Sequence, residues 1–283
     1  MNNNLNKRYV DISTKGQRKN KNNTGLKISR NILNPSNRFS SFINSSFQKN
    51  RNQLLDFDIQ NTGNELTRIQ TTFNENIQYW RVYNVTNMSG MFCGTILFNQ
   101  PIGNWDVSNV TTMDCMFCRA ESFNQPIGNW DVSNVTNMMC MFWEAKSFNQ
   151  PIGLWDVSNV NTMYSMFDSA ESFNQPIGSW DVSNVEDMSY MFYDVESFNQ
   201  PIGNWNVSKV ENMESMFSGA KNFNQAIGDW DVSNVTAMNC MFLLAESFNQ
   251  PIGSWDVSNV ENMDCMFRGA KSFNQPIGFW NVS

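Results

Sequence analysis

The stretch FNQPIGNWDVSNVTTM at residues 98–113 returns, barely altered, at residues 123, 148, 173, 198, 223, 248 and 273. Tryptophans mark its period, since nine of them follow one another from Trp80 to Trp280 at a spacing of 25 residues. A unit this short cannot bury its own apolar face and has to stack on its neighbours. Because periods of about 20–50 residues are typical of solenoids and arrays, the sequence predicts one elongated repeat solenoid.

Each repeat combines two apolar patterns. Ile102, Trp105 and Val107 have the spacing of the strand in leucine-rich repeats, and alternation places Trp105 and Val107 on one face of a short parallel strand. From Val110 to Phe123, apolar residues recur every three or four positions, which predicts a short helical segment. We therefore expect a leucine-rich-repeat-like coil of one short parallel β-strand and one short helical segment. The tryptophans expected to form the structural core are Trp105, Trp130, Trp155, Trp180, Trp205, Trp230 and Trp255.

The two parts of the chain differ in charge. Residues 1–52 contain eleven Lys or Arg and a single acid, which gives a charge of +10, whereas the remaining eight basic and 25 acidic residues give −17. The basic, Asn/Ser-rich head is expected to be disordered. Residues 53–77 resemble a degenerate capping repeat, and residues 78–283 are expected to form about eight repeats. The sequence shows no cap at the C-terminus, so we expect either that it is a fragment or that its open end meets a partner or a second copy of the chain, end to end.

A family resemblance lies in the repeat itself. FNQPIGNWDVSNVTNM at residues 123–138, followed by MF-x-x-A, resembles the repeat of the BspA-like leucine-rich-repeat surface proteins. This family was first catalogued as a mycoplasma repeat of unknown function. The similarity extends over residues 73–283 and implies a leucine-rich-repeat-like solenoid with a role in adhesion or protein binding.

Composition argues against an enzyme. The chain has no histidine, which removes the commonest general base and metal ligand. It also lacks a glycine-rich phosphate loop and a nucleophile elbow. We therefore expect no catalytic residues and no cofactor. The sequence has no apolar run of 18 residues and its start lacks the apolar core of a signal peptide, which favours an intracellular or virion-associated protein.

An acidic column follows the tryptophans and has two interpretations. Its carboxylates could form a calcium-binding strip, because hard cations take several oxygen ligands. Alternatively, each carboxylate could cap the following turn by accepting from backbone N–H groups. Asn206 and Asn281 take the acidic position in two repeats, and asparagine can cap but brings no charge, so capping is favoured. The acidic residues are Asp106, Asp131, Asp156, Asp181, Asp231 and Asp256.

The six cysteines also occupy columns. Cys115 and Cys118 have the spacing of half a zinc site, which Cys93 and Cys140 could complete. Later repeats that carry Cys240 and Cys265 lack the second column, so an accidental arrangement of reduced thiols is favoured.

Specific recognition is expected at the columns that vary between repeats. The residues predicted to face a partner are Asn129, Leu154, Ser179, Asn204, Asp229, Trp143, Asp168 and Tyr193. The preferred function is a non-enzymatic scaffold or adhesion module that binds protein. The alternative is a virion or assembly component whose basic head binds nucleic acid or another anionic surface.

Overall fold

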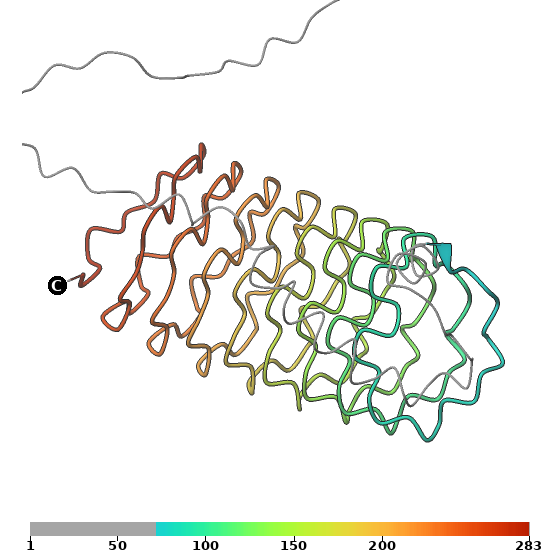
Figure 1. Ribbon diagram of the computed structural model, residues 1–283. Coiled ribbons are helices and arrows are strands. Elements are labelled where there is room, and N and C mark those ends of the chain that lie inside the picture. Colours follow the sequence, from blue (N-terminus) through green and yellow to red (C-terminus); the bar gives the residue numbers. More distant parts are fainter. Residues whose placement is uncertain (1–71, 283) are drawn as a thin grey trace, which may run out of the picture.

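The computed structural model describes residues 72–282, which form an elongated stack of similar coils (Figure 1). The predicted head at 1–52 and the first 19 residues of the predicted capping repeat lie outside this range. Equivalent positions of successive coils lie beside one another, 25 residues apart in sequence. They are joined by parallel bridges between Asn87, Thr112, Asn137, Thr162, Asp187, Asn212, Ala237 and Asn262. The predicted repeat solenoid is therefore confirmed.

The predicted secondary structure within each coil is wrong. Among residues 72–282, Thr72 alone is helical, and the only strand pairing consists of the single-residue bridges. These bridges join the positions of Thr112 and Asn137, not the Trp105–Val107 segment where a strand was expected. The alternation itself holds, since Trp105 and Val107 are buried and Asp106 is exposed.

Consecutive turns replace the predicted helix. Backbone N–H groups of Met116 and Ala120 donate to the carbonyls three residues earlier, at 3.1 and 3.0 Å. Cys115 and Arg119, the third residues of these turns, have φ values of 55° and 59°. A right-handed helix excludes such values, whereas a type II turn requires them at this position. Turns closed every three or four residues give the same apolar spacing as a helix.

The remaining backbone groups of this segment pair between coils. Met113, Cys115, Phe117 and Arg119 donate to the carbonyls of residues 24 positions later, in the next coil, at 2.6–3.0 Å. Hydrogen bonds within and between coils thus alternate along the segment. This pairing satisfies the buried backbone without a regular strand or helix.

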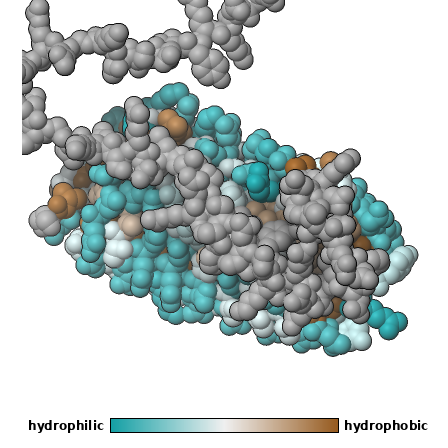
Figure 2. Space-filling model, in the orientation of Figure 1, coloured by the Kyte–Doolittle hydropathy of each residue, from teal (hydrophilic) through white to brown (hydrophobic). Residues whose placement is uncertain are grey.

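The core is a set of stacked columns. From Trp105 to Trp255 the tryptophans are 3–5% exposed, and each indole N–H donates to an isoleucine carbonyl of the preceding coil, as Trp130 Nε1 does to Ile102 O at 3.2 Å. Phenylalanines form parallel ladders beside them, with ring centroids 5.6 Å apart between Phe117 and Phe142. The outer surface on the side drawn in Figure 2 is mainly hydrophilic. No helix in residues 72–282 is long and apolar enough to cross a membrane.

Candidate functional site

The acidic column is engaged in local hydrogen bonds. Asp106 Oδ1 accepts from Ser108 N at 3.2 Å and from Ser108 Oγ at 2.6 Å. The backbone bond recurs at every acidic position from Asp131 to Asp256 and is kept by Asn206 at 3.2 Å. These hydrogen bonds lower the pKa of Asp106, Asp181 and Asp256. The geometry is that of a turn cap, and no group of three or more potential ligands in residues 72–282 is placed to hold a metal.

We expect Asp156→Asn to be nearly neutral and Asp156→Ala to cost about 0.5–2 kcal/mol of unfolding free energy. Asparagine can still accept the bond from Ser158 N, which measures 3.1 Å, whereas alanine cannot. Calcium should leave the melting temperature of the wild-type protein almost unchanged. Thermal melts with and without calcium test this, and tight calcium binding that is lost in Asp156→Asn would contradict it.

Amide ladders occupy two further columns, one of which is interrupted only by Lys209. Asn134 Nδ2 donates to Ser108 O in the preceding coil at 2.8 Å, and the same bond recurs along the stack. Asn124 N donates to Asn99 Oδ1 at 2.9 Å, and Gln125 Nε2 donates to the same atom at 2.9 Å. These side chains hold neighbouring coils together, so the constant columns serve the stack.

Variation between coils is concentrated beside the Met-Phe pair. We define the variable face as the positions equivalent to Met139, Cys140, Trp143 and Glu144 in every coil. The second and fourth of these positions are the ones with positive φ. Between them run the buried Met and Phe columns, which are constant. The stack therefore presents changing side chains on a repeated backbone of fixed geometry.

Tyrosines form the centre of the variable face. The ring of Tyr190 lies 5.7 Å from that of Tyr164 and 5.8 Å from that of Tyr193, tilted by about 45° in both pairs. Tyr190 OH donates to Glu214 Oε1 at 2.6 Å. Burial raises the pKa of all three phenols, so they are neutral hydrogen-bonding groups at neutral pH. Half-buried rings held in this way offer a rigid, amphipathic surface.

Asp168 lies beneath this surface. It is only 6% exposed, and Ser169 Oγ donates to its Oδ1 at 2.8 Å. Burial raises its pKa to about 7. Of the three residues predicted for this column, Trp143 and Tyr193 are half-exposed, whereas Asp168 supports the surface from below.

The other predicted partner-facing residues lie across the coil. Asn129 precedes Trp143 by 14 residues in a coil of 25. The rings of Phe117 and Trp130, with centroids 6.2 Å apart, pack in the core between these two sides of the coil. Leu154 is 94% exposed there. Ser179 Oγ donates to Gly153 O at 2.9 Å. The structure thus places the two predicted sets on opposite sides of the core. The remaining exposed members of the far set are Asn204 and Asp229.

Sequence reasoning missed Tyr164 and Tyr190. Both belong to columns that change from coil to coil, where serine, aspartate, methionine or cysteine stands in other repeats. A comparison of all 25 positions would have found them. Their contact with Tyr193 could not be read from the sequence, because it depends on the turn at Tyr190 with its φ of 59°.

The four cysteines singled out in the first repeats form a buried cluster packed against Trp143 and Tyr164. Hydrogen bonds from Cys118 and Cys140 lower the pKa of the Cys115 thiol to about 5. The hydrogen bond to Cys115, followed by burial, raises the pKa of both donors. The structure therefore brings these thiols together at one end of the variable face.

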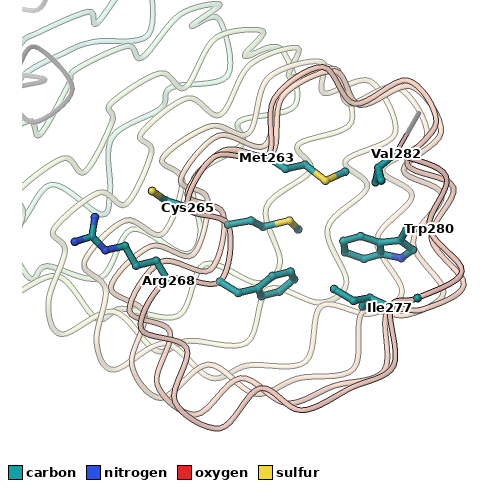
Figure 3. Close-up of a pocket in the computed structure, with 9 residues that line it drawn as sticks. Met263, Cys265, Arg268, Ile277, Trp280 and Val282 are labelled. Atoms are coloured by element: carbon teal, nitrogen blue, oxygen red, sulfur yellow. The ribbon is translucent and has the colours of Figure 1, made fainter. Parts of the chain in front are cut away.

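The last coil presents apolar side chains at the end of the stack. In Figure 3, Met263, Ile277, Trp280 and Val282 lie across this end, whereas Cys265 and Arg268 point away from it. These apolar residues are among those that line a shallow pocket, and Val282 is 72% exposed. The same columns are buried in the preceding coils.

Comparison with known families identifies the family of the repeat. A family model described as "Mycoplasma protein of unknown function, DUF285" matches residues 58–167, 126–217 and 200–283. A search of curated proteins found no match. The three matches overlap and together extend over residues 58–283, well beyond half of the chain. The chain therefore belongs to the family described as mycoplasma proteins of unknown function, DUF285.

Proposed function

We propose that this protein is a non-enzymatic binding module, a scaffold or adhesin, that recognises a protein through its variable face. One observation carries the proposal. The constant columns are engaged in the core and in hydrogen bonds between coils, whereas the side chains beside the Met-Phe pair change from coil to coil. We further assign the repeat to the BspA-like leucine-rich repeats on the FNQPIGNWDVSNVTNM motif.

The chemistry of the variable face favours a protein partner. Tyr and Trp are enriched at the energetic centres of protein interfaces, where they lose little conformational entropy on binding. Here Tyr190 contacts both Tyr164 and Tyr193, and Trp143 lies one coil from Tyr164. Glu214 accepts a hydrogen bond from Tyr190, and the carboxylate of Asp194 lies near Tyr193, which favours a partner that has basic residues around an apolar centre.

A matched pair of variants tests the proposal. Serine already occupies the columns of Tyr164, Tyr190 and Tyr193 in other coils, so the triple Tyr→Ser variant should fold. The control is Leu154→Ser on the opposite side, where Ser179 and Ser254 hold the same column. Full-length proteins are used to capture partners from an extract, and captured proteins are identified by mass spectrometry.

We expect the triple variant to lose a partner that the wild type and Leu154→Ser both retain. Loss of an aromatic residue at an interface hot spot costs about 2 kcal/mol or more of binding free energy, so the triple variant should bind the partner more than about tenfold less tightly. If the triple variant still captures the partner, or if Leu154→Ser no longer does, the partner is recognised outside the variable face. Equal melting temperatures for the three proteins make the comparison valid.

A second candidate function rests on the charge of the head. The +10 charge of residues 1–52 opposes the −17 of the remaining chain, which suits a virion or assembly component whose head binds a polyanion. We expect the full chain to bind DNA or acidic lipid vesicles at low salt and residues 53–283 not to bind them. Binding should weaken steeply between about 50 and 200 mM salt. A full chain that ignores polyanions at low salt would eliminate this candidate.

A further inference from the structure

The cysteines occur as pairs in neighbouring coils. Each cysteine has another in the same column, 25 residues away. The pairs are Cys93 with Cys118, Cys115 with Cys140, and Cys240 with Cys265. The first four thiols are buried, whereas Cys240 is half-buried and Cys265 is exposed. The last pair is therefore the one that a reagent in solution can reach.

Backbone hydrogen bonds hold this pair in register. Cys240 N donates to Asp264 O at 2.8 Å, and Phe242 N donates to Met266 O at 2.9 Å, so Cys265 lies between the two acceptors. Cys240 and Cys265 have φ values of 58° and 59°, which directs both side chains the same way. Cys265 lies close enough to Cys240 to contribute to the raised pKa of the Cys240 thiol. Figure 3 shows Cys265 pointing away from the apolar end of the stack.

We propose that Cys240 and Cys265 form an inter-coil disulfide when the protein meets a small-molecule disulfide such as oxidised glutathione. The bond would clamp the last described coil to the coil before it. Chains paired in parallel lie about 4.7–4.9 Å apart, within the range of about 4.4–6.8 Å between Cα atoms that disulfides adopt.

The reaction is two successive thiol–disulfide exchanges. The thiolate of Cys265 attacks one glutathione sulfur, the S–S bond of the reagent breaks, and the first glutathione leaves and takes up the proton lost by Cys265. The thiolate of Cys240 then attacks Cys265 Sγ, and the second glutathione leaves with the proton from Cys240. The two cysteines are oxidised by two electrons, and one glutathione disulfide is reduced to two thiols.

Access assigns the two roles. Cys265 is exposed and can meet the reagent first. Burial, followed by the neighbouring Cys265 and Glu214, raises the pKa of Cys240, which suits a thiol that reacts second and only within the protein. The four thiols of the buried cluster need the stack to open before they can react, so they should stay reduced in the folded protein.

The test uses the full chain after removal of reductant. The protein is incubated with oxidised glutathione, and it is then unfolded and alkylated so that every cysteine still reduced is labelled. Glutamyl endopeptidase cuts after Glu246 and Glu261, which places Cys240 and Cys265 in different peptides. We expect these two peptides to be disulfide-linked and the four buried cysteines to be alkylated. Amide hydrogen exchange in residues 262–282 should slow by about tenfold or more on oxidation, because the link suppresses local opening of the coil.

Two variants keep the proposal falsifiable. Cys265→Ser should abolish both the link and the slowed exchange. It should fold, since Ser165 and Ser215 hold this position in other coils with φ of 49° and 54°. Adding Ser215→Cys to Cys265→Ser should not restore a link to Cys240, because position 215 is only 5% exposed and offers no thiol that oxidised glutathione can reach first. Stable glutathione adducts on Cys265, links between two molecules, or unchanged exchange in the linked protein would overturn the proposal.

Discussion

Replacing Trp180 by alanine should lower the free energy of unfolding by about 3–5 kcal/mol, as expected when a buried tryptophan leaves a cavity. Trp180 is 3% exposed and lies between coils. Its ring stacks on Trp205 with centroids 6.5 Å apart and on Phe167 at 6.4 Å. Its Nε1 donates to Ile152 O at 3.1 Å, so the variant also leaves a buried carbonyl without its partner. Denaturant titration measures the loss.

Trp280→Ala is the matched control. Trp280 makes the equivalent hydrogen bond, to Ile252 O at 3.1 Å, and stacks on Trp255 at 6.3 Å, but it is only half-buried because it lies in the last described coil. Its loss should cost much less than that of Trp180. Equal losses for the two variants would show that the tryptophan column does not gain its stability from coils on both sides.

The repeat period determined most of what the sequence could predict about the fold. A spacing of 25 residues without a slip requires equivalent residues to stack, and the structure places Trp105 directly over Trp80 and below Trp130 in one column. Alternation correctly placed Asp106 outside and Val107 inside. Both inferences depend only on periodicity, which survives whatever backbone geometry connects the positions.

Local geometry could not be predicted in the same way. Val110, Met113 and Met116 recur at the spacing of a helix, yet the chain turns at Cys115 with a φ of 55°. Glycine would have signalled such a turn, and the first coil does have Gly90 and Gly94 at the two positions. The other coils have cysteine, serine or tyrosine at the first position, and five of them have arginine, glutamate, serine, aspartate or leucine at the second. Hydrogen bonds to both neighbouring coils offset the cost of the left-handed conformation.

Prediction of the candidate site was limited by the same local turn geometry. Column variation identified Trp143 and Tyr193 from the sequence, but it could not show that Asp168 between them is buried. It also could not show that the column of Leu154 lies on the other side of the core. Which variable residues share a surface depends on the path of the coil, and that path follows from the turns.

Gly153→Ala tests how closely the coils approach one another. A Cβ at Gly153 would lie well inside van der Waals contact of the Pro176 carbonyl oxygen, which belongs to the backbone of the next coil. A backbone carbonyl cannot rotate away as a flexible side chain can, so the coils must separate locally. We expect a loss of about 1–3 kcal/mol of unfolding free energy, as for other overpacked sites. Denaturant titration and amide exchange of residues 176–180 measure it.

Gly278→Ala should change the free energy of unfolding in the opposite direction. Gly278 holds the same position in the last described coil, but a Cβ there would have no atom within 4 Å, and its φ lies outside the left-handed region. Alanine then restricts only the unfolded chain, which should stabilise the protein by about 0.4–1 kcal/mol. The two substitutions are chemically identical and differ only in whether a coil follows. If both substitutions lower the free energy of unfolding, the turn itself requires the constant glycine. If the signs differ, its constancy follows from the close contact of one coil with the next.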